Sequence, residues 1–214
     1  MEAGQAVVQA VASARKKPTV VLQASGIGYY GLLGDEQVNE EAQPGNDWLA
    51  RLAVEWENST AAVEEMGVRR VVLRTGLVLA RQGGTLSLIA LPFRLFVGGT
   101  LGNGRQYWSW IHLDDEAGAI CFLMENQAAH GVYNLTAPNP LPMGQFGHIL
   151  AAVIKRPYWL PVPGFVLRLM LGEMSNLVLG GQRVVPMRLL SAGYSFKYAE
   201  LQPALENLLG TARR

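Results

Sequence analysis

Short apolar strands alternate with helices along the first 135 residues of this chain. Strands are predicted over 19–24, 68–73, 106–111 and 132–135, and helices over 1–16, 48–66, 85–96 and 116–126. Continuous apolar runs are typical of strands covered on both faces, and their alternation with helices predicts a parallel sheet. The expected fold class is therefore α/β, with a partial doubly wound parallel sheet of the Rossmann-like kind.

The character of the sequence changes after residue 137. Prolines recur from Pro138 to Pro186, and they separate short apolar helices predicted over 143–154, 164–171 and 199–209. Proline ends helices because it lacks the amide proton and clashes with the preceding turn. We expect residues 1–137 to form part of a nucleotide-binding domain and residues 138–214 to form a small, mostly helical lobe on the substrate or partner side.

Composition narrows the class of protein. Half of the residues are hydrophobic and 16% are charged, which is typical of a compact globular chain. The net charge of +1 favours neither nucleic acid nor an anionic membrane surface as a partner. The amino end lacks the features of a secretory signal, and Arg168 and Glu173 interrupt the longest apolar stretch. We expect a cytoplasmic protein.

Cys121 is the only cysteine of the chain. A single cysteine excludes an internal disulfide and a cysteine metal cluster, and no metal site is expected. The apolar neighbours of Cys121 predict a small buried side chain rather than a nucleophile.

Three strand-to-loop junctions, at 20–31, 71–84 and 108–115, are rich in glycine or polar residues. The carboxyl ends of parallel strands share one edge of a sheet, where α/β proteins bind ligands. We therefore expect Ser25, Gly76 and Trp110 to converge on one cleft. No Gly-x-Gly-x-x-Gly turn follows a strand near the amino end, so the pattern is typical of half a nucleotide-binding site.

Several motifs occur together in an order typical of one family. They are SGIGYYG at 25–31, WE at 56–57, RTGLVL at 74–79, PF at 92–93, GG at 98–99, GNG at 102–104, WIHLDD at 110–115, NLTAP at 134–138, PVP at 161–163 and GY at 193–194. In this order they resemble the atypical short-chain dehydrogenase/reductase group known as epimerase family proteins, or cell-division inhibitor-like proteins. The resemblance spans nearly the whole chain.

The resemblance implies NAD(P) as the cofactor, with NADP favoured, and an oxidoreductase or epimerase acting on an unknown small molecule. In that family a strand, the Gly-rich turn and two further βα units precede the matching region. The chain therefore resembles a carboxy-terminal two-thirds, and we expect impaired activity and weak cofactor binding from it alone. A homo-oligomer or another partner is expected to cover the exposed sheet edge.

The acid–base pair of extended short-chain dehydrogenases is missing from its expected place. Relatives of that kind carry a Tyr-x-x-x-Lys pair before a helix glutamate. If Glu57 is that glutamate, the two positions hold Leu49 and Ala53, and neither side chain transfers a proton. We expect both to pack inward, on an apolar stripe with Leu52 and Trp56. An alternative function is therefore a non-catalytic nucleotide-sensing or protein-interaction module.

Three residues are candidates for the chemical step. Ser25 stands where the resemblance implies a hydroxyl that polarises a substrate carbonyl; the alternative is that it satisfies loop amides. Tyr30, beside Tyr29, could supply the phenol that position 49 lacks, or it could pack with its hydroxyl at the surface. His112 could act as a general acid or base, or be held by backbone groups.

The cofactor is expected at Thr75, Gly76, Leu77 and Val78, because the resemblance places the nicotinamide carboxamide against this backbone. Gly76 either permits that close approach or is only the exit of a buried strand. Arg74 stands next to a buried strand end, so it should be paired with a carboxylate or a ligand.

Arg105, Trp108 and Trp110 are the candidate substrate residues, because they offer a cation and an aromatic platform. The two tryptophans alternate along a strand, so both should face one side, either the pocket or the lobe interface. Asp114 and Asp115 stand at a helix start, where we expect at least one of them to cap the helix.

Overall fold

The computed structural model describes residues 2–175 and 179–210. At its centre lies a parallel three-stranded sheet in the order β1-β3-β7, formed by β1 (Val20–Gly26), β3 (Arg69–Thr75) and β7 (Gly131–Leu135). Within the described residues β1 pairs only with β3, so one edge of β1 makes no ladder bonds. The expected α/β class with a parallel sheet is confirmed.

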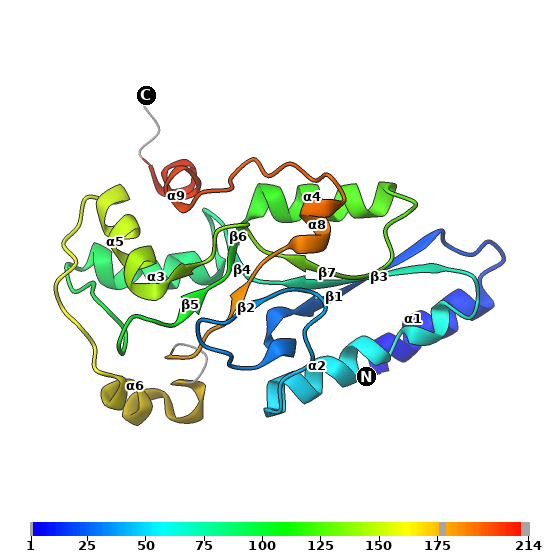
Figure 1. The fold of residues 1–214 in the computed structure, drawn as a ribbon, viewed down its shortest axis with the longest axis horizontal. Helices are drawn as coiled ribbons and strands as arrows, with labels where there is room; N and C mark the ends of the chain where they lie inside the picture. The colour runs from blue at the N-terminus through cyan, green and yellow to red at the C-terminus, as the bar shows by residue number, and fades with distance from the viewer. Residues whose placement is uncertain (1, 176–178, 211–214) are drawn as a thin grey trace.

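Helices cover both faces of this sheet (Figure 1). On one face lie α1 (Glu2–Ser13) and α2 (Trp48–Asn58), and on the other lie α4 (Leu113–Glu125) and the short α8 (Met187–Ser191). Hydrophobic side chains of β3, α4 and β7, including Val71, Leu123 and Leu135, form one core cluster. The doubly wound arrangement follows because each strand-to-strand crossover carries a helix to one face or the other.

Three short strand pairs continue the structure beyond the carboxyl edge of the sheet. The parallel pairs are β4 (Leu77–Leu79) with β6 (Trp110–His112) and β2 (Gln37–Val38) with β9 (Arg183–Val184); the antiparallel pair is β5 (Tyr107–Trp108) with β8 (Leu141–Pro142). The strand expected over 106–111 is therefore two strands in different sheets. Two of these strand pairs, β2 with β9 and β5 with β8, join residues on opposite sides of position 137. The expected division of the chain at residue 137 therefore separates strands that are hydrogen-bonded to each other.

Four further helices surround these strands, and Figure 1 shows them gathered at the end of the sheet away from α1. They are α3 (Gly84–Arg94), α5 (Met143–Val153), α6 (Gly164–Leu171) and α9 (Leu201–Leu209). The described residues also form three single-turn 3₁₀ helices: η1 (Ile27–Tyr30), η2 (Ala61–Val63) and η3 (Gly172–Ser175). A second core cluster joins α3, α5 and α9 around the fully buried Trp110.

The helix α2 differs from its expected form. Asp47 caps it as expected, by accepting a hydrogen bond from the Ala50 amide at 2.8 Å, but it ends at Asn58 rather than near residue 66. The expected inward stripe was wrong for Leu49 and Leu52, which are 41% and 43% exposed, whereas Ala53 and Trp56 are half-buried. The fully buried positions of the helix are Ala50 and Glu57. The helix turns its Ala50–Glu57 side inward because Glu57 has buried polar partners there.

Two further features are the exposure of the single cysteine and the length of the helices. Cys121 is exposed on α4, so the prediction of a buried thiol was wrong. None of the helices in the described ranges combines the length and apolar character that a bilayer span requires.

Candidate active site

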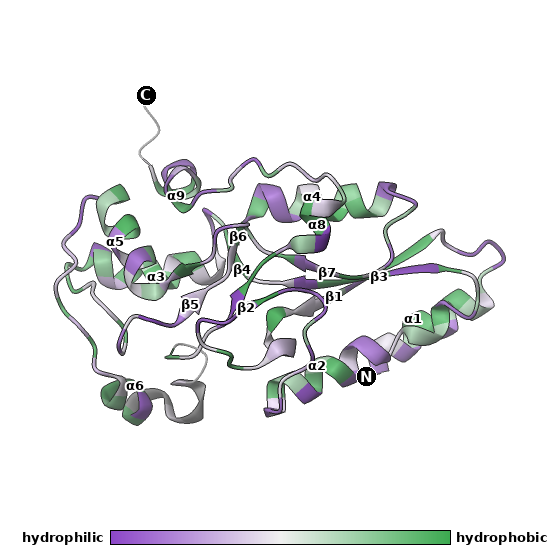
Figure 2. Ribbon diagram, viewed as in Figure 1, coloured by the Kyte–Doolittle hydropathy of each residue, from purple (hydrophilic) through white to green (hydrophobic). Residues whose placement is uncertain are grey.

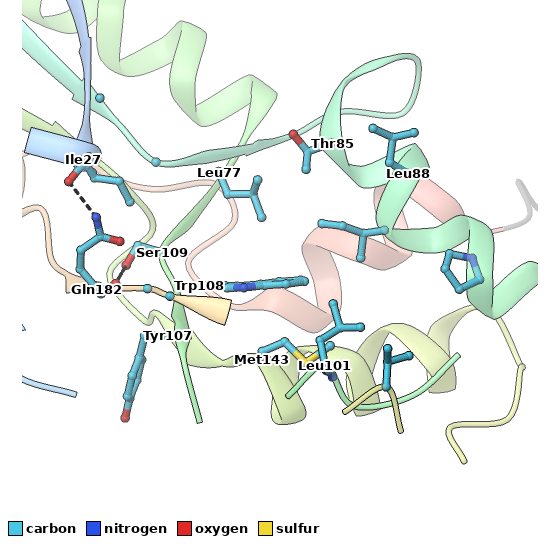
Figure 3. Close-up of a pocket in the computed structure, with 18 of the residues that line it drawn as sticks. Ile27, Leu77, Thr85, Leu88, Leu101, Tyr107, Trp108, Ser109, Met143 and Gln182 are labelled. Atoms are coloured by element: carbon cyan, nitrogen blue, oxygen red, sulfur yellow. Dashed lines mark hydrogen bonds between the residues drawn. The ribbon is translucent and has the colours of Figure 1, made fainter. Parts of the chain in front are cut away.

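A cavity of about 600 Å³ opens at the carboxyl edge of the sheet (Figure 3). One wall comes from the glycine-rich ends of β1 and β3, at Gly26–Gly28 and Thr75–Leu77. The opposite walls come from α3, β5, the start of α5 and residues 180–182. A site at the strand carboxyl ends is the place where α/β proteins bind ligands.

The sheet register explains how the glycine-rich wall forms. Gly26 lies opposite Thr75 in the β1–β3 ladder, so the two strand exits open at the same level. At Gly76 the chain leaves β3, and the Gly76 amide donates to the Leu135 carbonyl at 3.0 Å. Ser25 and Gly76 therefore share one edge of the sheet, but the expected convergence of Ser25, Gly76 and Trp110 on one cleft was wrong, because only Gly76 of the three lines the cavity.

Gly76 and Gly28 are glycines for different reasons. A Cβ on Gly76 would lie 2.4 Å from the carbonyl oxygen of Ser109, so the neighbouring strand already requires glycine there. A Cβ on Gly28 would meet nothing within 4 Å, because that position faces open cavity. Free space at Gly28 is therefore space available to a ligand, whereas the close approach at Gly76 is internal to the protein.

Figure 3 shows the Trp108 ring in the middle of the apolar side chains of this cavity, with Leu77 on one side and Met143 and Leu101 on the other. Trp108 also packs edge-on against Phe146 of α5, with ring centroids 5.0 Å apart. The hydroxyl of Ser109 donates to the Gln182 carbonyl at 2.7 Å, which fixes the far wall to the strand.

The candidate Ser25 does not line this cavity. Successive side chains of a strand point to opposite faces, so Gly26 faces the cavity and Ser25 faces α2. The Ser25 hydroxyl donates to the Glu57 carboxylate at 2.7 Å. Its only proton is thereby committed to a protein acceptor, which is neither the substrate carbonyl nor the loop amides that the sequence suggested.

Glu57 in turn binds Arg74 through two bonds. The Arg74 Nε and Nη2 atoms donate to the two carboxylate oxygens at 2.9 and 2.8 Å, and both side chains are buried. Burial alone would lower the pKa of Arg74, but the hydrogen bonds to Glu57 and Tyr30 outweigh it and raise that pKa. The expected carboxylate partner of Arg74 is confirmed.

Tyr30 completes this buried network. Its hydroxyl accepts from Arg74 Nη1 at 3.1 Å and donates to Asn134 Oδ1 at 2.7 Å, and its side chain is fully buried. Of the two alternatives for Tyr30, the surface hydroxyl was wrong, because the side chain is fully buried. Burial, against the opposing effect of Arg74, raises the pKa of Tyr30, so the phenol stays protonated near neutral pH. Tyr30 is outside the cavity lining.

His112 lies on the side of β6 that faces α9. Its Nδ1 atom accepts from the Asp114 amide at 3.0 Å and its Nε2 atom pairs with Asn207 at 3.2 Å, while its ring stacks on Tyr198. His112 is therefore the cap of α4, in place of Asp114 or Asp115. Burial lowers the pKa of His112, so the ring is neutral in this capping role.

The Asp115 carboxylate does not cap α4 but binds backbone amides of the segment before α9. It accepts the amides of Lys197 and Tyr198 at 2.7 and 2.8 Å, which ties the segment before α9 to α4. Asp114 forms an exposed ion pair with Lys197, and this pair lowers the pKa of Asp114.

The remaining candidates divide between cavity and core. Thr75, Gly76, Leu77 and Trp108 line the cavity; Val78, Arg105 and Trp110 do not. Trp110 is wholly buried in the cluster with α5 and α9, and Trp108 packs against the same cluster. The two tryptophans therefore face one side, which is the core between β6, α5 and α9, with Trp108 also reaching the cavity. Arg105 is exposed.

Position 49, where the resemblance expects a catalytic tyrosine, lines a second cavity of about 200 Å³. This smaller cavity adjoins the first, because Ile27, Gly28 and Gln182 line both. The Leu49 side chain therefore borders the site without offering a proton.

Sequence reasoning missed most of the side-chain walls. Thr85, Leu88, Ile89 and Met143 line the cavity through α3 and α5, and the segment 180–182 closes it. Their apolar character predicts only burial, so no residue pattern distinguishes cavity lining from core. The pairing of β5 with β8 brings Met143 beside Trp108, and such long-range pairing is not readable from local sequence.

Comparison with known proteins places this site in a family. Epimerase family protein YfhF of Bacillus subtilis is 42% identical over 196 residues, covering 91% of this chain and 64% of that protein. Epimerase family protein SAR0825 of Staphylococcus aureus is 38% identical over 211 residues, covering 98% of this chain and 70% of that protein. This chain belongs to the epimerase family.

Other comparisons agree with this assignment. The human epimerase family protein SDR39U1 (isoform 2), solved with NADPH, superposes with a TM-score of 0.90 at 31% identity, covering 97% of this chain and 70% of that one. A nucleoside-diphosphate sugar epimerase of Corynebacterium glutamicum has a TM-score of 0.74 at 29% identity, covering 97% of this chain and 41% of that one. A family described as a domain of unknown function (DUF1731) matches residues 162–208.

The chain spans only part of its relatives. It covers 64% of the Bacillus subtilis protein and 56% of the Arabidopsis thaliana chloroplastic homologue. Within the epimerase family, the matched part contains the strand ends, the cavity and the region of the DUF1731 match.

Proposed function

We propose that this chain supplies the nicotinamide-facing wall and the substrate cavity of an NADP(H)-dependent oxidoreductase or epimerase. The observation that carries the proposal is the glycine-rich wall at Gly26–Gly28 and Thr75–Leu77, which borders an apolar cavity of about 600 Å³. The similar human protein was solved with NADPH. When bound, a nicotinamide supplies or accepts a hydride at such a wall.

The residues present fit a flat ring. Gly28 leaves open space where another residue would place a side chain, and Gly76 keeps the strand exits close together. Leu77 and Trp108 offer apolar surface on either side of that space, and apolar walls exclude the water that competes with a hydride acceptor. These residues bind and orient; they hold no proton.

The Thr75 side chain at this wall is hydrogen-bonded to an acidic residue, Glu116. The Thr75 hydroxyl donates to Glu116 of α4 at 2.8 Å, and burial raises the pKa of Glu116 to about 7. The Glu116 carboxyl orients the Thr75 hydroxyl away from the cavity in its ionised form. The second oxygen of Glu116, Oε2, is buried and has no hydrogen-bond partner among the described residues.

A second candidate is a nucleotide-sensing or interaction module without turnover. The observation that favours it is the leucine at position 49 and the commitment of the Ser25 proton to Glu57. Turnover separates the two: a module of this kind binds NADPH but never transfers deuterium from [4-²H]NADPH to a carbonyl compound.

The binding proposal is tested by filling the space at Gly28. We expect Gly28→Leu to weaken NADPH binding by about tenfold or more, because the added side chain occupies the space that the ring needs. Gly28→Ala is the matched control and should have a much smaller effect. NADPH fluorescence titration measures both, at protein and NADPH concentrations high enough to detect the weak binding expected of this chain alone, with circular dichroism to confirm folding. Equal NADPH affinity of the wild type and the folded Gly28→Leu variant would refute the proposal.

A further inference from the structure

The side chains around the cavity carry no charge. Among the described residues that line it, none is a lysine, arginine, aspartate, glutamate or histidine. The walls are built chiefly from Leu88, Ile89, Phe93, Leu101, Trp108 and Met143. Figure 2 shows that α3, which contributes the first three of these residues, is mostly hydrophobic along its length.

Three polar side chains of the lining, those of Thr75, Ser109 and Gln182, are hydrogen-bonded within the protein. The Thr75 hydroxyl donates to Glu116, the Ser109 hydroxyl donates to the Gln182 carbonyl, and the Gln182 amide donates to the Ile27 carbonyl at 3.1 Å. Figure 3 shows the last two bonds side by side at one end of the cavity. A ligand with many polar groups would therefore have to compete for these partners.

Two arginines are close in sequence to lining residues but do not line the cavity themselves, and the Nε atom of one, Arg183, is buried without a hydrogen-bond partner among the described residues. Arg183 follows the lining residue Gln182, but its guanidinium lies 5.4 Å from the centroid of the Tyr107 ring. Tyr107 points away from the ring of Trp108 in Figure 3. Arg105 is exposed and does not line the cavity.

This distribution decides between two classes of ligand. A diphosphate buried without a cation loses its hydration and gains no ion pair, which costs several kcal/mol. An apolar ligand gains roughly 25 cal/mol for each Å² of apolar surface removed from water. The walls therefore disfavour a nucleoside-diphosphate sugar and favour an apolar molecule.

We propose that the substrate of this cavity is an uncharged, predominantly apolar carbonyl compound or the corresponding alcohol, without phosphate or carboxylate groups. The proposal rests on the proposed function in treating the ligand as a hydride acceptor or donor. The redox balance would then be complete: bound NADPH would supply the hydride for the new C–H bond at the carbonyl carbon and leave as NADP⁺, and bulk solvent at the cavity mouth would supply the proton for the oxygen.

The entrance of the cavity is apolar, as its walls are. Leu88 lines the cavity and is also 71% exposed, so an apolar side chain stands at the mouth. Leu91, one turn further along α3, is 49% exposed and does not line the cavity. The two leucines provide a matched pair, because both tolerate substitution at the surface and only one borders the ligand.

The test uses the uncharged dye N-phenyl-1-naphthylamine, whose fluorescence rises in an apolar site. We expect trans-1-decalone and 2-decanone to displace the dye from the wild-type protein, and UDP-glucose and UDP to leave it bound. Leu88→Arg should weaken dye and decalone binding by about tenfold or more, because it places a charge at the mouth. Leu91→Arg should bind both as the wild type does.

Two results would overturn the proposal. One is displacement of the dye by UDP-glucose but not by decalone, with the UDP-glucose effect lost in Arg183→Met. The other is equal loss of dye binding in Leu88→Arg and Leu91→Arg, which would place the dye on the exposed surface of α3.

NADPH titration on the same samples keeps the two proposals apart. Decalone binding without NADPH binding supports the apolar ligand class and refutes the proposed cofactor. NADPH binding with UDP-glucose as the only second ligand supports the cofactor and refutes the apolar class.

Discussion

The two sides of the sheet's carboxyl edge differ sharply in chemistry. On the α2 side, Ser25, Glu57, Arg74 and Tyr30 form a buried hydrogen-bonded chain. On the cavity side, the described lining residues carry no charged group. The side chains most suggestive of catalysis thus stabilise the fold, and the ligand space is built from glycine backbone and apolar side chains.

This difference shows how consecutive residues of one strand contribute to the buried polar network and to the cavity wall. Ser25 and Gly26 are consecutive, and alternation sends the first to the polar network and the second to the cavity. Arg74 and Thr75 divide in the same way across β3, with Arg74 bound to Glu57 and Thr75 at the cavity wall. The network fixes the strand ends, so the glycine-rich wall keeps its position when the cavity is filled.

The largest expected effect comes from removing Glu57. Glu57→Ala leaves Arg74 buried without its carboxylate, which should lower the free energy of unfolding by about 3–5 kcal/mol. Urea denaturation measures the change. The exposed Glu55 of the same helix supplies the control, and Glu55→Ala should leave the urea midpoint unchanged.

A double variant sharpens this prediction. Glu57→Leu with Arg74→Met removes both charges together, so it should be clearly more stable than Glu57→Ala despite changing two residues. If the double variant is the less stable of the two, the buried pair is not the source of the Glu57 effect.

A smaller loss is expected for Tyr30→Phe. The change removes a hydroxyl that bridges Arg74 and Asn134, so it should cost about 1–3 kcal/mol in the free energy of unfolding. Tyr29→Phe is the control, because the Tyr29 ring stacks on Arg74 and the variant keeps that ring. Decalone and NADPH affinities should be unchanged in Tyr30→Phe; a loss of ligand affinity with full stability would place the phenol in the site.

The smallest effect concerns Glu116 and pH. Burial raises the pKa of Glu116 from 4.5 to about 7, so the folded state holds a proton that the unfolded chain releases. The stabilisation of the folded state by the protonated Glu116 carboxyl is fully present below about pH 4.5 and is lost as pH rises through about 7. Glu116→Gln should therefore have a higher melting temperature than the wild type at pH 8.

The two curves should meet at low pH. Near pH 4.5 the wild-type carboxyl is protonated and resembles the amide, so Glu116→Gln should show no advantage there. Glu125→Gln on the same helix is the control, with no pH-dependent difference expected. A Glu116→Gln advantage that is equal at pH 4.5 and pH 8 would mean that packing, not ionisation, separates the proteins.

Local sequence predicted the fold better than the site. The strand–helix alternation predicts the parallel sheet, and Asp47 is recognisable as a cap because its side chain acts three residues away. The motifs from Ser25 to Tyr194 correctly predict the epimerase family. By contrast, the apolar stripe of α2 misleads, because Glu57 is buried through partners on β1 and β3 that lie 32 and 17 residues away.

The chemical role of a residue depends on such distant partners. The sequence suggests a catalytic hydroxyl at Ser25, but in the structure that hydroxyl donates its proton to Glu57. The sequence likewise suggests a general acid or base at His112, but Asn207 and the Asp114 amide hold its ring. Trp110 is equally ambiguous, since only the packing of α5 and α9 places it in the core. Alternation along a strand predicts which residues share a face, but the tertiary structure decides which face meets the ligand.

A crystal structure with NADPH tests the central claim most directly, because it locates the nicotinamide relative to the two sides of the edge. The ring should lie against the backbone of Thr75–Leu77 and Gly28, facing Trp108, with Ser25 still bound to Glu57. A nicotinamide on the α2 side instead, against Ser25 and Leu49 with the Ser25–Glu57 bond broken, would contradict the account.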